Sequence, residues 1–272
     1  MSENNVPPAA GASTGVVVVA AGSGRRLGQG IPKARVLCGG RTLLEHSLEA
    51  VVASGVAAVV VVVLPAGDTV LSDVVASAQQ ASGDSGPRIS AVTGGATRTA
   101  SVRAGLDALP PSVGVVLIHD AARALAPPAV FQRVAAAVGS GAPAVIPVLP
   151  VVDTVKTVEG DVVTATPDRA TLRAVQTPQG FAAARLRAAH AGASAGDPGV
   201  TDDAMLMEAE GTTVRVVDGD ALAFKVTTPL DLVVAEAVLA QRTVVLPVAD
   251  PGRTPSPAPP TAEQHRSARV PE

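Results

Sequence analysis

Short runs of β-branched residues alternate with Ala- and Leu-rich segments along most of this chain, and this alternation limits the folds open to it. The apolar runs predict strands at Val16–Ala20, Ala57–Leu64, Arg88–Val92, Val113–His119 and Ala142–Val148. The segments between them predict helices at Leu43–Ala53, Asp68–Gln80, Thr97–Leu109 and Pro127–Val138. Strands that are apolar throughout are typical of a parallel sheet with helices on both faces. We therefore expect an α/β protein built on a mostly parallel sheet.

The pattern changes after residue 150. The segment "VVDTVKTVEGDVVTATP" (151–167) alternates and contains a Glu-Gly-Asp turn, which predicts a hairpin arm extending from the body. Beyond it we expect helices at Phe181–Ala191 and Asp202–Glu210 and a strand at Thr212–Val217. The last helix is predicted to begin after Thr228, where "TTPLD" supplies an N-cap, a proline and an acidic residue in the first turn, and to end near Gln241.

The size and composition of the chain are those of one globular domain. A chain of 272 residues, 47% of them hydrophobic, can bury one large core. No internal repeat is visible, and we expect a single domain over residues 15–248. Residues 1–14 and the Pro-rich segment 249–272 lack apolar periodicity and are expected to be disordered.

Composition also excludes several classes of protein. The formal net charge of −3 argues against a nucleic-acid-binding protein, which usually has a basic face. The apolar run at Ala57–Leu64 is too short to cross a bilayer, and residues 1–14 show no secretory signal. Cys38 is the single cysteine, so no intramolecular disulfide can form. We expect a cytoplasmic protein that binds neither nucleic acid nor membrane.

A glycine-rich loop follows the first predicted strand, in the stretch "VAAGSGRRLGQGIPKAR" (19–35). A dinucleotide-binding G-x-G-x-x-G pattern would require glycine where the chain has Leu27. A P-loop is excluded because Lys33 follows a proline and precedes neither Ser nor Thr. Glycine N–H groups with nearby cations can still bind phosphates. A solvated basic loop is the alternative.

Lysine is rare in this chain, because Lys33, Lys156 and Lys225 are the only three and arginine supplies the other cations. An ammonium is a compact charge, whereas the arginine fork is broader and favours bidentate contacts. Positions that keep lysine are therefore candidates for contact with a phosphate group.

The pattern A-A-G-x-G-x-R followed by P-K resembles the signature of nucleotidyltransferases. Further motifs follow in order: "GGATRTASVRAGL" (94–106), "VLIHDAARAL" (116–125), "VDTVK" (152–156), "TPDR" (166–169), "TPQGF" (177–181), "TDDA" (201–204) and "FKVTTPLDL" (224–232). Together they resemble the 2-C-methyl-D-erythritol 4-phosphate cytidylyltransferase family of the non-mevalonate isoprenoid pathway, over about Val16 to Arg242. The resemblance implies a Rossmann-like nucleotidyltransferase fold, a homodimer formed through the β-arm, and the use of CTP, a polyol phosphate and Mg²⁺ or another divalent cation.

The resemblance also assigns roles to individual residues. The implied catalytic residues are Arg26, Lys33, Arg169 and Lys225. The implied CTP contacts are Ala20, Ala21, Gly22, Gly24, Arg25, Gly95, Ser101 and Asp120. The implied polyol phosphate contacts are Arg123, Thr154, Thr201 and Asp202. Asp120 is also the implied metal contact, with the metal held mainly by the CTP phosphates. Thr154 and Arg169 are expected to come from the arm of the partner subunit.

Other interpretations remain open at this point. Asp202 could only favour the N-terminus of its helix, and Thr154 could be a plain strand residue. A ribitol 5-phosphate cytidylyltransferase shares the loop and the segment around Asp120. A nucleotide-binding regulatory module without turnover is a third reading, against which the presence of Arg26 and Lys33 argues. The chain departs from the family pattern at Val19, Ala34, Arg35, Ala96, Ala124 and Thr228.

Overall fold

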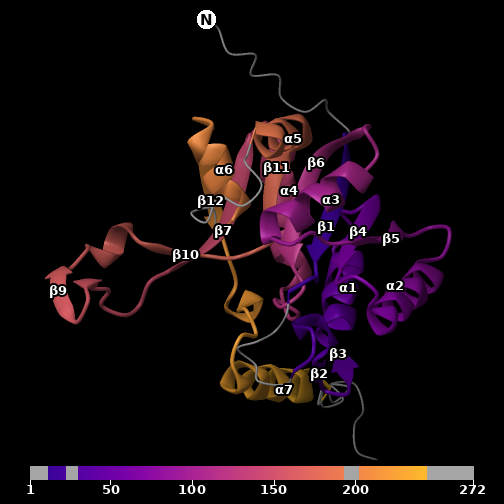
Figure 1. The fold of residues 1–272 in the computed structure, drawn as a ribbon, viewed down its shortest axis with the longest axis horizontal. Coiled ribbons are helices and arrows are strands. Elements are labelled where there is room, and N and C mark those ends of the chain that lie inside the picture. Colours follow the sequence, from indigo (N-terminus) through magenta and orange to yellow (C-terminus); the bar gives the residue numbers. More distant parts are fainter. Residues whose placement is uncertain (1–11, 23–29, 193–201, 244–272) are drawn as a thin grey trace, which may run out of the picture.

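A computed structural model describes residues 12–22, 30–192 and 202–243, and its centre is an eight-stranded sheet (Figure 1). The strand order is β10-β7-β11-β6-β1-β4-β5, and β12 pairs with β7. The principal strands are β1 (Ser13–Val19), β4 (Val59–Leu64), β5 (Arg88–Thr93), β6 (Val113–Asp120), β7 (Ala144–Pro150) and β12 (Val214–Asp218). Strand β1 runs parallel to both β4 and β6, and β5 runs parallel to β4. The expected α/β fold with a mostly parallel sheet is confirmed.

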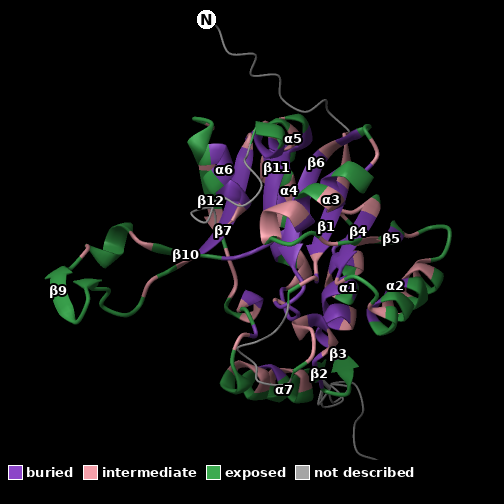
Figure 2. Ribbon diagram, viewed as in Figure 1, coloured by how far each residue is buried: buried purple, intermediate pink, exposed green. Residues whose placement is uncertain are grey.

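Helices cover both faces of the sheet, as the continuously apolar strands predict. One face carries α1 (Leu43–Ala53), α2 (Thr69–Ser82) and α4 (Pro128–Gly139). The other carries α3 (Arg98–Ala108), α5 (Ala183–Gly192) and α6 (Asp203–Ala209). Successive side chains of a strand point to opposite faces, so Val16 and Val18 pack with α1 while Val17 packs with α3. Figure 2 shows the strands as the buried centre of the molecule.

Two antiparallel strands interrupt the parallel order. Strands β10 (Arg173–Val175) and β11 (Gln179–Ala182) pair antiparallel with β7, and β11 also pairs antiparallel with β6. The sequence did not indicate these two strands, and the predicted start of a helix at Phe181 was wrong. Phe181 is a fully buried residue of β11, and the helix begins two residues later at Ala183. Its ring contributes to the core beneath α3, α5 and α6, which favours the strand position.

The expected hairpin is present and extends away from the sheet (Figure 1). It consists of β8 (Thr157–Glu159) and β9 (Val162–Ala165), joined at Gly160 with φ +60°. Beyond it a short 3-10 helix, η3 (Arg169–Thr171), precedes β10. We call residues 151–172 the arm. Residues 152–166 are all exposed in this chain, as the green colour in Figure 2 shows.

The final helix, α7 (Pro229–Thr243), lies beyond the carboxyl edge of the sheet with the two-stranded ribbon of β2 (Leu37–Cys38) and β3 (Arg41–Thr42). The predicted start signal is confirmed, because the Thr228 N–H donates to Asp231 and the Asp231 N–H donates to the Thr228 hydroxyl. Strand β1 begins at Ser13, so residues 13 and 14 belong to the sheet and not to a disordered terminus. Within the described residues, no helix is both long and apolar enough to cross a membrane.

Candidate active site

A pocket lies at the carboxyl edge of the sheet, where the strand order reverses. The chain goes from β1 outward through β4 to β5 and then returns to place β6 on the other side of β1. Open α/β sheets bind ligands at such a point. The pocket has a volume of about 560 Å³. It is lined by residues 19–22 at the end of β1 and just after it, by 33–34, by 95–98 and 101 before and within the first turn of α3, by 120–122 at the end of β6, and by Lys225.

One wall of the pocket is built from small residues in close contact. The Ser101 hydroxyl donates to the Thr97 carbonyl at 2.9 Å and accepts from the Gly95 N–H at 3.2 Å. A Cβ at Gly95 would lie 2.5 Å from the Ala100 Cβ, so only glycine fits there. Ala20 and Ala21 line the same pocket. This wall can hold a flat ring between backbone groups, and it contains no aromatic side chain.

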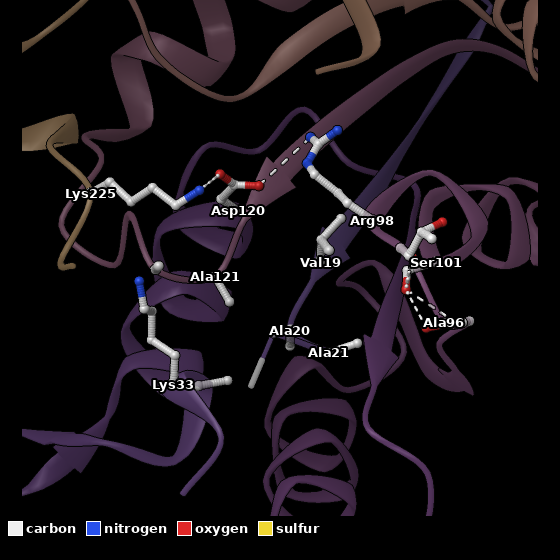
Figure 3. Close-up of a pocket in the computed structure, with 15 residues that line it drawn as sticks. Val19, Ala20, Ala21, Lys33, Ala96, Arg98, Ser101, Asp120, Ala121 and Lys225 are labelled. Carbon is white, nitrogen blue, oxygen red and sulfur yellow. Dashed lines mark hydrogen bonds and ion pairs between the residues drawn. The ribbon is translucent and has the colours of Figure 1, made fainter. Parts of the chain in front are cut away.

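The opposite side of the pocket is charged. Lys225 donates from Nζ to Asp120 Oδ2 at 2.7 Å, and Arg98 Nη2 lies 3.7 Å from Asp120 Oδ1 (Figure 3). Burial alone would raise the pKa of Asp120, but Lys225 and Arg98 outweigh it and hold that pKa well below its usual range. Asp120 is therefore ionised between two cations. Its Oδ1 is paired with Arg98, but at 3.7 Å this contact is too long for a hydrogen bond.

Lys33 enters the pocket from the short 3-10 helix η2 (Lys33–Arg35). Its backbone N–H donates to the Gly22 carbonyl at 3.3 Å, which ties this helix to the loop after β1. Lys33 and Lys225 thus line one pocket although 192 positions separate them (225 − 33). Two of the three lysines meet at one cavity, as their scarcity suggested.

His119 next to Asp120 is a structural residue and not a proton carrier. Its Nδ1 lies 3.1 Å from the Thr177 hydroxyl, which also accepts the Asp120 N–H at 3.0 Å. Its ring packs against Phe131 with centroids 4.8 Å apart. Burial lowers the pKa of His119 to about 3, so the ring is neutral at physiological pH.

Arg123 and Asp202, both expected to contact the polyol, make protein contacts here and do not line the pocket. Arg123 donates to the carbonyls of Ala223 and Val175 at 2.8 and 3.1 Å, and so connects β10 to the segment that carries Lys225. Asp202 caps α6 by accepting the Met205 N–H at 3.0 Å. The helix-capping alternative for Asp202 is therefore realised in this chain.

The arm extends away from the sheet (Figure 1), and none of its residues lines the pocket of its own chain. Thr154 is exposed, and Arg169 donates to the Val152 carbonyl at 2.8 Å within the arm. Neither residue lines the pocket. Gly24, Arg25, Arg26 and Thr201 lie outside the described residues.

Two residues of this site, Arg98 and Asp203, were not predicted from the sequence. Arg98 lines the pocket, and Asp203 accepts from Arg98 Nη1 at 2.8 Å. Arg98 stands at the first position of α3, an end of a helix where the dipole disfavours a cation. A cation at this unfavourable position in the motif 94–106 is the sequence feature that could have indicated a functional role for Arg98. Burial lowers the pKa of Arg98, but Asp203 and Asp120 outweigh that effect and raise it.

The donor set limits how a divalent cation could be held. Among the described residues no group of three His, Cys, Asp or Glu side chains could ligate a metal. Asp120 is a single carboxylate within the pocket, and Mg²⁺ is commonly bound by one or two carboxylates together with substrate phosphates. The residues therefore fit a cation carried mainly by a phosphate ligand.

A doubly covered α/β sheet with a small-residue wall and paired cations at its switch point defines a nucleotide-binding protein of the nucleotidyltransferase class. The model of the IspD family, 2-C-methyl-D-erythritol 4-phosphate cytidylyltransferase, matches residues 14–241. The chain belongs to this family.

Individual relatives and solved structures agree with this membership. The chain is 49% identical to a 2-C-methyl-D-erythritol 4-phosphate cytidylyltransferase of Corynebacterium efficiens, over 82% of this chain and 91% of the relative. It is 52% identical to one of Streptomyces coelicolor, over 85% and 86% of the two chains. A crystal structure of 4-diphosphocytidyl-2C-methyl-D-erythritol synthase from Anaerococcus prevotii matches with a TM-score of 0.73 and 31% identity, over 85% of this chain and 99% of that one.

Proposed function

We propose that this enzyme joins CTP and 2-C-methyl-D-erythritol 4-phosphate in the pocket at the carboxyl edge of the sheet. The products are 4-diphosphocytidyl-2-C-methyl-D-erythritol and pyrophosphate. An oxygen of the polyol phosphate attacks the α-phosphorus of CTP in line, and the bond from that phosphorus to the bridging oxygen breaks as pyrophosphate leaves. The observation that carries the proposal is the meeting of Lys33, Lys225 and Asp120 beside the small-residue wall.

The chemistry requires positioning and charge more than a protein base. A phosphate monoester with a second pKa near 6 is largely a dianion at neutral pH, so the nucleophile needs no deprotonation. Phosphoryl-type transfer is accelerated chiefly by orientation and by cations placed where charge develops. His119 agrees with a reaction that uses no protein base. It is fully buried, so it cannot reach a substrate, and its low pKa makes it a poor proton acceptor.

Each cation has a distinct proposed role. Lys33 and Arg26 stabilise the pentacoordinate transition state at the α-phosphate, where negative charge peaks. Lys225, with Arg169 of a second copy, holds and aims the polyol phosphate. Lys225 already lies beside Asp120, so the carboxylate holds the ammonium in the pocket until the phosphate arrives.

The small-residue wall is the proposed cytidine site. Gly95 and Ser101, with Ala20, Ala21 and Gly22, bring backbone groups to the ring. Thr201, Asp202 and Arg123 are proposed to lie around the polyol, although Arg123 and Asp202 contact other protein groups in this chain. Gly24 and Arg25 complete the phosphate loop.

Mg²⁺ or another divalent cation is the proposed cofactor, held by Asp120 and mainly by the CTP phosphates. When bound, it would neutralise part of the charge on the triphosphate. The proposed compartment is the cytoplasm. Cys38 supports this, because it is a buried free thiol of the kind that a reducing compartment preserves.

The proposed assembly is a homodimer formed through the arm. The arm exposes Val152, Val158, Val162 and Val163 to solvent, each more than half exposed, and a lone two-stranded hairpin is marginally stable. Pairing across a two-fold axis would bury these valines. The same docking would bring Thr154 and Arg169 to the pocket of the other chain.

One assay tests the substrate assignment directly. Pyrophosphate release from CTP is measured with 2-C-methyl-D-erythritol 4-phosphate and with ribitol 5-phosphate in separate reactions. We expect release with the first. Release with ribitol 5-phosphate alone would favour the alternative cytidylyltransferase, which the comparisons do not support. Release with neither would favour a binding module without turnover.

A further inference from the structure

Four charged side chains and a histidine form a row of contacts from the pocket to the interior of the protein. Lys225 contacts Asp120 at 2.7 Å, and Asp120 lies 3.7 Å from Arg98. Arg98 donates to Asp203 at 2.8 Å. Asp203 in turn accepts from His190 Nε2 at 3.0 Å. We call these five residues the charge row.

The inner end of the charge row is deeply buried, whereas its outer end is partly exposed except at Asp120, whose side chain is 12% exposed. The side chain of Lys225 is 39% exposed and that of Arg98 is 29% exposed, whereas those of Asp203 and His190 are 1% and 2% exposed. An ionised carboxylate at such depth is stable only when it is paired and hydrogen-bonded. Asp203 has both oxygens engaged, one by Arg98 and the other by His190.

Two neighbouring aspartates divide two tasks at the start of α6. Asp202 is the N-cap, with one oxygen on the Met205 N–H and the other on the Gln179 side chain. Asp203 therefore is not needed for capping, and its side chain turns into the core toward Arg98 and His190. Asp203 is the first residue of α6, but its carboxylate accepts from Arg98 and makes no capping contact.

Without Asp203, Arg98 would have a different best partner. Its guanidinium would then have Asp120 as the nearest carboxylate, at present 3.7 Å away. Because an arginine fork binds a carboxylate bidentately, it would compete with Lys225 for the same two oxygens. The contact with Asp203 thus holds Arg98 at 3.7 Å from Asp120. At that distance Asp120 Oδ2 stays available to Lys225.

We propose that Asp203 is a positioning residue for the transfer reaction, which acts through Arg98 to set the place of Asp120 and Lys225, with His190 fixing Asp203 from behind. This inference rests on the proposed function for its kinetic consequence. The contact it describes is a property of the chain and can be measured without turnover.

The first test uses the rarity of lysine. Lysine labelled with ¹³C at Cε gives one signal for each of three lysines, so Lys225 can be assigned by loss of its signal in Lys225→Arg. We expect Asp203→Asn to displace the Lys225 signal. Glu208→Gln, the same change at an exposed position of the same helix, should leave it in place.

The second test is kinetic, in the same variants. We expect Asp203→Asn to raise KM for 2-C-methyl-D-erythritol 4-phosphate about tenfold or more, and to change KM for CTP less than about twofold, because a displaced Lys225 would lose its charge-assisted contact with the polyol phosphate. A loss of folded protein would instead lower kcat and leave both KM values unchanged. His190→Gln, which keeps a donor toward Asp203, should retain more activity than His190→Leu.

The outcomes separate the inference from the proposed function. A displaced Lys225 signal with a raised KM for the polyol phosphate supports the positioning role. An unmoved Lys225 signal, or an unchanged KM despite a moved signal, overturns it. If the unmodified chain releases no pyrophosphate with this substrate, the proposed function fails, whatever the lysine spectra show.

Discussion

The pocket and the arm hold their charged residues in opposite ways. In the pocket, Asp120 is buried and paired with Arg98 of α3 and with Lys225 of the segment before α7. In the arm, Lys156 donates to Thr166 at 2.7 Å and Arg169 donates to Val152 at 2.8 Å, and all of these groups are exposed. Burial strengthens the first set of contacts, whereas solvent weakens the second.

This contrast shows which parts of the site one chain can build alone. The pocket wall, Lys33 and the charge row are placed by packing within a single copy. The arm holds its cations outside the pocket of its own chain.

The largest effect is expected in the pocket. Lys33→Ala, and likewise Arg26→Ala, should lower kcat about 100-fold or more and change KM for CTP much less, because their charge matters most in the transition state. Lys33→Arg should also be poor, since the fork cannot take the place of the ammonium. Steady-state kinetics measures this. Lys156→Ala is the matched arm lysine, and an equal loss there would break the contrast between the regions.

The second prediction asks whether the arm serves a partner. Arg169→Ala and Lys225→Ala chains, each inactive alone, should recover about a quarter of the unmodified activity when mixed and allowed to exchange. Half the dimers would be mixed, and each would have one intact site. The activity of the mixture measures this.

A matched mixture sharpens the result. Thr154→Ala and Arg169→Ala both alter the arm, so their mixed dimers have no intact site and should show no gain. Two results would contradict an active site shared between two chains. One is sedimentation as a monomer, and the other is no recovery of activity after verified exchange of Arg169→Ala with Lys225→Ala.

The third prediction concerns selectivity of the small-residue wall. Cytosine presents a donor where uracil presents an acceptor, so carbonyls near Ala20 and Gly95 should reject UTP. An unpaired buried carbonyl costs on the order of 1–3 kcal/mol, which corresponds to roughly 5- to 150-fold in kcat/KM. Competition between CTP and UTP measures the ratio. Comparable turnover of both would show that the cytidine site has been misplaced.

The smallest effect is expected at the tip of the arm. Gly160 has φ +60°, which a side chain disfavours, so Gly160→Ala should destabilise the hairpin by about 1 kcal/mol. Dimer dissociation should rise accordingly, while the thermal midpoint of the body stays unchanged. Gly139→Ala is the control, because a Cβ there meets nothing within 4 Å. If Gly160→Ala lowered the thermal midpoint and left dimer dissociation unchanged, the arm would contribute to the stability of the single chain and not to dimerisation.

Much of the fold could be predicted from short-range signals. The apolar runs predicted β1, β4, β5, β6 and β7, and helix boundaries fell close to their caps. The Glu-Gly-Asp turn and the Thr228 start signal were read correctly, since both depend on neighbours within four residues. Strands β10 and β11 escaped prediction because they are short and are held by pairing with β7 and β6, far away in the chain.

The candidate site divides in the same way. The sequence by itself determined that cations and an aspartate stand at the carboxyl ends of strands, and that the chain matches an ordered set of family motifs. Only the tertiary structure decided which groups meet. The Asp120–Lys225 and Arg98–Asp203 contacts each join residues 105 positions apart. Local propensity carries no information about such pairs, because their distance is set by how helices and strands pack around a common core.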